Sequence, residues 1–337
     1  MMIGKKNTIK IKFVDFWGGF DSKNNDFVSI ISERYQVEFT DEPDYLFYSC
    51  FGYEHLKYDC IRIFYTGECI TPNFNECDYA IGFDRLEFGD RYKRIPLYRL
   101  FQYKTEYAEL FDRPIFTKEN LRSKTGFCSF VYSNCFAMDL RTQIFEKLSA
   151  YKQVSSGGRY RNNIGGAVSD KKAFQSYHKF AIAFENSSYD GYCTEKLMEA
   201  FAAGTIPIYY GDPRVVEDFN VKAFINCHDY DSLEDVVDRI IEIDNDDNLY
   251  LSIRNASPLH NTTMITENGL AEFLYHILEQ DYEKTYRRPF SAHPQKLEKA
   301  QLRHAVFETH IYGRYQKIKN ILIRICTGTM LTNKRNK

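Results

Sequence analysis

The first part of the chain alternates apolar and polar residues with the periods of strands and short helices. In the stretch 8–16, Ile9, Ile11 and Phe13 occupy alternate positions, which is typical of a strand. Further apolar runs of buried-strand length occupy 44–50, 60–68 and 77–84, and a stretch that favours a short helix occupies 26–34. The mostly polar stretch 114–126 interrupts this pattern, so we expect a domain junction there.

A second series of strands and helices follows the junction. The predicted strands are 127–134, 179–186 and 205–211, and the predicted helices are 139–151, 171–178, 194–204 and 231–244. Strands that alternate with helices indicate an α/β architecture with largely parallel sheets. Two such series predict two Rossmann-like domains that face a cleft. We place the first domain at residues 1–120, the second at 121–285 and a C-terminal tail at 286–337.

The tail differs from the rest of the chain in charge. Residues 301–337 hold eight Lys or Arg side chains against one acid, Glu308, and their apolar residues recur at steps of three or four. A basic amphipathic helix of this kind can lie on an anionic membrane. It can equally be a helix that docks on the protein with its basic face in solvent. The pattern favours neither alternative.

Charge and cysteine content narrow the class of protein. The formal net charge of −2 gives no general case for nucleic-acid binding. Nine cysteines without a CxxC pair favour reduced cytosolic thiols over a disulfide framework or a zinc site. The N-terminus lacks the apolar region of a signal peptide, and no apolar run has the length of a membrane span. We therefore predict a cytoplasmic protein that binds no nucleic acid.

The acidic run 244–248 resembles a metal-binding sequence. It follows a predicted helix and is rich in residues that form turns. We therefore expect a solvated loop rather than a metal site.

The stretch 184–213 concentrates polar side chains around one short helix. Thr194 is a suitable N-cap, which places Glu195 and Lys196 in the first helical turn. Free backbone N–H groups and the charge of Lys196 favour a diphosphate there, whereas the Glu195 carboxylate is suited to accept hydrogen bonds from sugar hydroxyls. A capped amphipathic helix with solvated Glu and Lys side chains explains the same pattern about equally well.

Other candidate groups lie beyond the ends of predicted strands, where open α/β sheets bind their ligands. This rule selects Glu68, Asn134 and the pair Glu185 and Asn186. Glu68 could act as a general base towards an incoming hydroxyl. A glutamate that only forms hydrogen bonds within a turn is the commoner explanation for such a residue. Arginines suit diphosphate because the planar guanidinium binds two oxygens at once, and the candidates are Arg141, Arg159 and Arg161. A flexible basic loop is the commoner explanation for Arg159 and Arg161, which lie in a glycine-rich stretch.

The sequence "FAIAFENSSYDGYCTEKLMEAFAAGTIPIYYGDP" is similar to the signature of the α1,3/4-fucosyltransferases, glycosyltransferase family 10. That family carries an F-x-x-x-F-E-N-S segment, then Y-x-T-E-K, then a T-x-P-[IV] strand and a glycine. The segments "FYTGE", "PNFN", "DYAIGFD" and "DRYKRIPLY" resemble the bacterial branch. The resemblance covers roughly residues 9–280. One departure is Ile70, which stands where bacterial members often have a second glutamate.

The resemblance implies a two-domain GT-B fold, GDP-fucose as donor and inversion at the anomeric carbon. It implies Glu68 as catalytic base, Arg141 and Lys196 at the diphosphate, Asn186, Tyr192 and Glu195 at the donor sugar and ribose, and Glu185 as a supporting carboxylate of the cleft. The expected acceptor is N-acetylglucosamine within N-acetyllactosamine, which would give Lewis-type structures. No metal cofactor is expected, because the two cations meet the charge of the diphosphate. The alternatives are a transferase for another GDP-sugar and a non-catalytic nucleotide- or glycan-binding protein.

Overall fold

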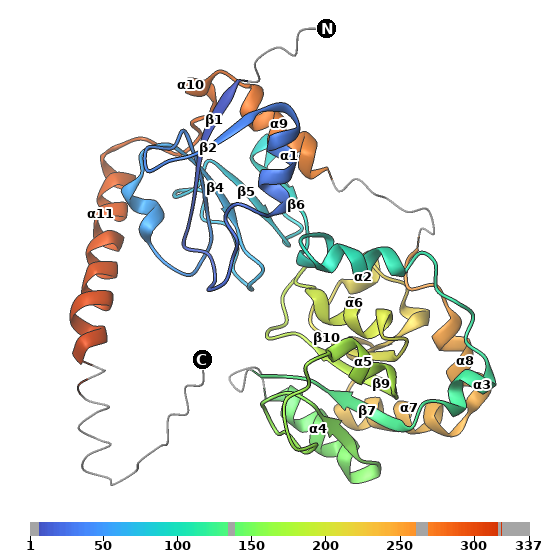
Figure 1. Cartoon of the computed structure of the whole chain (residues 1–337). Helices are drawn as coiled ribbons and strands as arrows, with labels where there is room; N and C mark the ends of the chain where they lie inside the picture. The colour runs from blue at the N-terminus through green and yellow to red at the C-terminus, as the bar shows by residue number, and fades with distance from the viewer. Residues whose placement is uncertain (1–6, 134–138, 261–268, 316–317, 319–337) are drawn as a thin grey trace, which may run out of the picture.

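Two parallel sheets organise the molecule, which is shown as a computed structural model in Figure 1. The structure describes residues 7–133, 139–260, 269–315 and 318. The first sheet contains β1 (Thr8–Val14), β2 (Gln36–Phe39), β3 (Tyr45–Tyr48), β4 (Ile61–Tyr65), β5 (Tyr79–Gly82) and β6 (Tyr92–Arg94), in the order β2-β1-β3-β4-β5-β6. The second contains β7 (Gly126–Phe130), β8 (Val154–Ser156), β9 (His178–Phe184), β10 (Ile206–Tyr210) and β11 (Ile225–Asn226), in the order β11-β10-β9-β7-β8. The predicted pair of Rossmann-like units is confirmed.

Helices surround the two sheets. Those of the second unit are α2 (Tyr103–Glu109), α3 (Lys118–Arg122), α4 (Leu140–Tyr151), α5 (Lys171–Ser176), α6 (Glu195–Ala202), α7 (Leu233–Asn245) and α8 (Asp247–Asn255). The first unit carries α1 (Asp26–Arg34), α9 (Leu270–Glu279), α10 (Tyr282–Thr285) and α11 (Ala292–Val306). Helix α1 begins where the Asn25 side chain accepts the backbone N–H of Val28, and it buries Phe27 and Ile31. The sequence predicted the α1 bounds correctly.

Two helices cross the boundaries that the sequence predicted. Leu270, Phe273 and Leu274 of α9 lie in the core of the first sheet, although we predicted a second domain that continues to residue 285. In the other direction, α2 contacts α6 of the second unit, as Figure 1 shows, although we assigned residues 1–120 to the first domain. An amphipathic helix encodes which of its faces is buried, but its local sequence does not encode which of two sheets it covers.

The acidic run 244–248 is not the solvated loop that the sequence predicted. Asp244, the penultimate residue of α7 (Leu233–Asn245), has a buried carboxylate that pairs with Lys152 and Lys179. Asp246 then begins α8, because its side chain accepts the backbone N–H of Leu249. Turn-forming residues therefore mark a junction between two helices here, and a distant pair of lysines compensates the buried charge.

The tail begins with a helix that docks on the first unit. The Arg62 guanidinium, whose side chain is 3% exposed, donates to Glu298 of α11 at 2.6 Å. Gln301 donates to Glu76 at 2.6 Å, and Ala305 is buried. Docking therefore holds for α11, while residues 319–337 lie outside the described part of the chain. None of the described helices has both the length and the apolar character of a membrane span.

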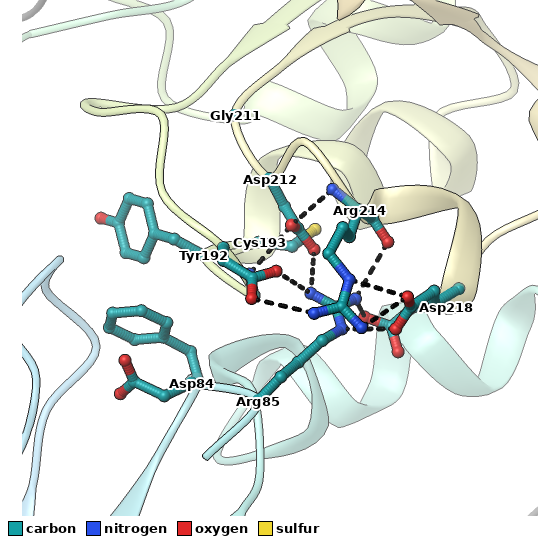
Figure 2. A network of polar contacts seen from close by, with 12 residues as sticks. Asp84, Arg85, Tyr192, Cys193, Gly211, Asp212, Arg214 and Asp218 are labelled. Carbon is teal, nitrogen blue, oxygen red and sulfur yellow. Dashed lines mark hydrogen bonds and ion pairs between the residues drawn. The ribbon is translucent and has the colours of Figure 1, made fainter.

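A cluster of ion pairs joins the two units. Figure 2 shows Arg85, which follows β5 of the first sheet, among carboxylates that belong to the second unit. Its guanidinium lies 2.8 Å from Asp212, 2.9 Å from Asp218 and 2.9 Å from Glu217. Asp212 is fully buried and also accepts the backbone N–H of Gly191, so the cluster fixes the loop that leads from β9 to α6.

Candidate active site

A cavity of about 810 Å³ lies between the two units and is lined by residues of both. Glu68 and Trp17 come from loops after β4 and β1 of the first sheet. Asn186, Tyr192, Thr194, Glu195 and Lys196 come from the loop after β9 and the start of α6. The carboxyl ends of strands from both parallel sheets therefore meet around one space, as expected of α/β folds that bind ligands.

Glu68 stands at the end of a short turn beyond β4. Its backbone N–H donates to the Thr66 hydroxyl at 3.0 Å, and the Thr66 hydroxyl also lies 3.2 Å from the Cys50 thiol. The Leu97 side chain packs closely on Gly67, the residue before Glu68. A Cβ at Gly67 would lie 3.1 Å from the nearest atom of Leu97. The side chain of Glu68 is exposed and lines the cavity. A carboxylate held in this way is accessible to a ligand hydroxyl.

Glu185 lies beneath the cavity rather than on its wall. Its side chain is fully buried and accepts the backbone N–H of Thr194 at 2.7 Å and the Thr194 hydroxyl at 2.7 Å. The ammonium of Lys196 lies 2.9 Å from the same carboxylate. Glu185 therefore holds the start of α6 and positions Lys196, whereas the sequence analysis had expected it to be a carboxylate of the cleft.

Thr194 precedes α6 at the predicted N-cap position, but its side chain makes no capping hydrogen bond to the helix. Its hydroxyl bonds to Glu185 instead, so capping by this side chain was a wrong prediction. The hydroxyl donates to the Glu185 carboxylate, and its oxygen accepts from the Lys196 ammonium at 2.8 Å instead of from a backbone N–H group of α6. The first-turn backbone N–H groups of α6 are consequently not occupied by a Thr194 cap.

Lys196 and Glu195 form a charged pair on the cavity wall. The Lys196 ammonium lies 3.2 Å from the Glu195 carboxylate. Burial opposes the charge on Lys196, but the carboxylates of Glu185 and Glu195 outweigh it and raise the Lys196 pKa well above its ordinary value. Burial likewise opposes ionisation of Glu195, yet Lys196 and Lys171 lower its pKa to about 2. Both groups are therefore charged at neutral pH.

Arg141 is buried behind the end of β9. One nitrogen, Nη2, donates to the carbonyls of Phe184 and Glu185 at 3.0 and 2.9 Å and to the Asn186 side chain at 3.0 Å. The guanidinium lies 4.0 Å from the centroid of the Tyr132 ring. Its Nε and Nη1 are buried without a hydrogen-bond partner among the described residues. A buried guanidinium with two unused donors is suited to an anion, since an unpaired buried charge is costly.

The predicted site residues thus gather in one region of the molecule. Glu68, Asn186, Tyr192, Glu195 and Lys196 line the cavity, while Glu185 and Arg141 lie behind it. Arg161 pairs with Glu146 on the surface, and neither it nor Arg159 lines the cavity. Asn134, which the strand-end rule also selected, lies outside the described residues.

The first-domain wall of the cavity was not predicted from the sequence. Trp17, Phe20, Phe51 and Phe101 line it, together with Asp21 and Asp26, and Lys104 of α2 also lines the cavity. The strand-end rule of α/β sheets applies equally to the loop after β1, and the presence of the chain's one tryptophan in that loop was a usable signal. In the part of the chain that the structure describes, no group of three or more His, Cys, Asp or Glu side chains could hold a metal ion.

Comparison with known proteins places this geometry in a family. Residues 11–101 match the "Alpha-(1,3)-fucosyltransferase FucT N-terminal domain", and residues 121–267 match "Glycosyltransferase family 10 (fucosyltransferase) C-term". A crystal structure of an alpha1,3-fucosyltransferase is 32% identical, has a TM-score of 0.72 and aligns with 86% of this chain and 95% of its own. The chain belongs to glycosyltransferase family 10, the fucosyltransferases. The resemblance and the two-domain GT-B fold that it implied are confirmed.

Relatives in this fucosyltransferase family differ in how much of their length they share. The alpha-(1,3)-fucosyltransferase FucT of Helicobacter pylori is 35% identical over 295 residues, which are 75% of this chain and 60% of that protein. The bovine 3-galactosyl-N-acetylglucosaminide 4-alpha-L-fucosyltransferase FUT3 is 34% identical over 143 residues, 42% of this chain and 39% of its own. The chain therefore spans less than two thirds of either curated relative.

Proposed function

We propose that this protein transfers L-fucose from GDP-fucose to the N-acetylglucosamine of N-acetyllactosamine-type glycans. The linkage would be α1,3 or α1,4, the anomeric carbon would be inverted, and the products would be Lewis-type structures. The observation that carries the proposal is the composition of the cavity. An accessible carboxylate from one unit faces, across one space, the polar and cationic residues from the other. A crystal structure "with GDP-fucose" of a 32% identical alpha1,3-fucosyltransferase, TM-score 0.69, supports the donor.

The second unit would bind the nucleotide sugar. The Lys196 ammonium and the two unused donors of Arg141 would meet the diphosphate, and Glu195 would accept hydrogen bonds from hydroxyls of the ribose or fucose. Glu185 holds Lys196 in place through a buried ion pair. The ammonium therefore needs little movement, and little reorganisation free energy is lost, when negative charge grows on the leaving GDP. Asn186 and Tyr192 would contact the donor sugar.

The first unit would supply the base. An acceptor hydroxyl on the face opposite GDP attacks the anomeric carbon, and the bond from that carbon to the diphosphate oxygen breaks. A new bond forms to the acceptor oxygen, GDP leaves with the electron pair, and Glu68 takes the hydroxyl proton. This assignment fits an exposed carboxylate at a strand end, and general-base catalysis commonly contributes about 10²–10⁴-fold in rate.

We also propose that the reaction needs no divalent metal. Lys196 lines the cavity and Arg141 is buried behind it, so these two protein cations would meet the charge that develops on the diphosphate. Cations of this kind stabilise a leaving diphosphate by the same electrostatic effect as a bound metal ion.

Two other functions remain as alternatives, and one assay separates them. The first is transfer from another GDP-sugar, and the second is binding of nucleotide or glycan without catalysis. Release of GDP would be measured with GDP-fucose, GDP-mannose and a panel of type 1 and type 2 disaccharide acceptors. Acceptor-dependent GDP release from GDP-fucose supports the proposal, release only from GDP-mannose supports the first alternative, and binding without release supports the second.

The variant Glu68→Gln tests the mechanism in the same assay. It should lose about 10²–10⁴-fold in turnover while GDP binding stays close to that of the unmodified protein. The matched control is Glu87→Gln, which changes an exposed glutamate that does not line the cavity. Turnover of Glu68→Gln within a few-fold of the control would remove Glu68 from the role of base.

A further inference from the structure

The first-domain wall of the cavity is built from aromatic rings. Trp17 and Phe20 come from the loop after β1, and Phe101 precedes α2. The Trp17 ring centroid lies 5.0 Å from that of Phe20 and 5.8 Å from that of Phe101, both edge to face. Phe51 also lines the cavity and is 50% exposed. We refer to Trp17, Phe20, Phe51 and Phe101 as the aromatic wall.

Packing behind the aromatic wall holds it in place. Phe20 stacks on Phe16 with ring centroids 4.0 Å apart. The loop starts at Asp15, which has a positive φ of 59° and whose carboxylate accepts the backbone N–H groups of Glu54 and His55 at 3.0 and 2.9 Å. A backbone conformation that is unfavourable for aspartate persists only where the surroundings determine it. The wall is therefore preorganised, which reduces the entropy lost when a ligand binds.

Open space lies directly after Trp17. A Cβ placed at Gly18 or Gly19 would meet no heavy atom within 4 Å. The two glycines therefore place no side chain in the space beside Trp17. Partial exposure of Trp17 means that its ring is available to a ligand as well as to the core behind it.

Most of the charged side chains around the aromatic wall are acidic. Asp21, Asp26 and Glu68 line this part of the cavity, and Lys104 is the cation beside them. Lys104 is already paired with Asp26 at 2.6 Å, and Asp26 also accepts the backbone N–H of Phe101. Three carboxylates against one paired ammonium leave an excess of negative charge. This environment repels an anionic ligand, whereas it offers acceptors to hydroxyl groups.

We propose that the aromatic wall is an acceptor subsite in which Trp17 supports the apolar face of an uncharged sugar ring beside Glu68. A pyranose has an apolar C–H face and a rim of hydroxyl groups, which matches rings flanked by carboxylates and amides. Pockets of this composition, apolar with a few placed polar groups, are typical of small-ligand sites. The proposal rests on the proposed function and extends it, because it assigns the acceptor to a place and excludes acceptors with a carboxylate at that place.

Fluorescence tests the position of the acceptor, because Trp17 is the one tryptophan in the chain. The full chain would be titrated with N-acetyllactosamine in the presence of GDP, and separately with GDP alone. We expect a saturable change in Trp17 emission with the disaccharide and little change with GDP. A disaccharide that is turned over, yet leaves the emission unchanged at saturation, would overturn the subsite.

Kinetics test its contribution. Trp17→Ala should raise the acceptor KM about tenfold and Trp17→Phe less than about threefold, because an aromatic contact of this kind changes an equilibrium by up to about a factor of ten. GDP affinity should be unchanged in both variants. The matched control is Tyr177→Ala, which removes a 60% exposed ring of the second unit. An acceptor KM for Trp17→Ala equal to that of the control would overturn the proposal. If Trp17→Ala melts early, the fluorescence titration of the unmodified chain still decides.

Charge provides an independent test. The kcat/KM for N-acetyllactosamine should exceed that for the same disaccharide with a carboxylate on its galactose, and Asp21→Asn should narrow the difference. Equal kcat/KM values for the two acceptors would contradict the electrostatic argument. The outcome is separable from that of the proposed function. A saturable change in emission without any fucose transfer would support the acceptor subsite and contradict the proposed fucosyltransferase activity. Fucose transfer that does not depend on Trp17 would support the activity and contradict the subsite.

Discussion

Arg85→Gln removes the side chain that links the two units through the ion-pair cluster of Figure 2. Arg85 is 9% exposed, and its partner Asp212 is fully buried. After the substitution, Asp212 keeps the backbone N–H groups of Gly191 and Arg214 but has no guanidinium. A buried charge that loses its partner costs about 3–5 kcal/mol of unfolding free energy. The cluster also contains a matched control in Arg214.

Arg214 belongs to the same cluster but lies in solvent. Its side chain is 52% exposed and pairs with Asp190 and Glu217, which are 43% and 45% exposed. Exposed pairs of this kind contribute about 0–1 kcal/mol. Arg214→Gln should therefore change stability several-fold less than Arg85→Gln, although both variants remove one positive charge.

Thermal melting measures the difference. A chain of 337 residues has an unfolding entropy of about 0.7 kcal/mol/K, so Arg85→Gln should lower the Tm by about 4–7 °C and Arg214→Gln by about 1 °C. The loop that carries Asn186 and Tyr192 leads into this cluster, so turnover should fall in Arg85→Gln as well. A double-mutant cycle with Asp212→Asn would give the coupling energy. Equal Tm shifts for the two arginine variants, or a coupling energy below about 0.5 kcal/mol, would refute the reasoning.

Three further predictions concern the donor site and the tail. Lys196→Ala and Arg141→Ala should each weaken GDP binding and lower turnover about tenfold or more, because the charge they meet grows in the transition state. Calorimetry would measure the GDP affinity of each variant. The control is Lys152→Ala, which removes a lysine that pairs with Asp244 and does not line the cavity. Unchanged GDP affinity in both site variants would exclude Lys196 and Arg141 from the donor site. Activity should persist in EDTA, and loss on chelation that manganese restores would contradict a metal-free mechanism. Finally, the basic residues of 301–337 should bind anionic vesicles at low salt and release them at high salt. A variant that ends at residue 318 retains α11, and vesicle sedimentation equal to that of the full chain would assign no membrane role to the segment it lacks.

The short polar motifs allowed the candidate site to be predicted from the sequence. Parallel strands end at the same edge of a sheet, so Glu68 and Asn186 were expected near a ligand before any distance was known. Both line the cavity. The bounds of α1 and the existence of α6 followed from the local pattern of apolar and polar residues, which depends on neighbouring residues only. These features depend only on residues that are close together in the sequence.

Tertiary structure alone decided the roles that depend on distant partners. Glu185 became a buried support for Lys196 because Thr194, nine positions further along the chain, turns its hydroxyl towards it. Asp244 became a buried ion-pair partner because Lys152 and Lys179 reach it from other elements. In each case the local sequence is compatible with a carboxylate in solvent or in the interior. The carboxylate is buried because cations from other parts of the fold pair with it, and no local pattern specifies them.

The sequence by itself determined two α/β units and the motifs of family 10, because strand and helix periods and strand-end side chains are local properties. It did not determine that α9 returns to the first sheet, that α11 docks through Glu298, or that Trp17 faces the same cavity as Lys196. These outcomes depend on which apolar faces meet across the chain. The free energy gained by burying apolar surface depends on the area and not on which elements meet. Only the assembled fold therefore selects one pairing of faces among the possible ones.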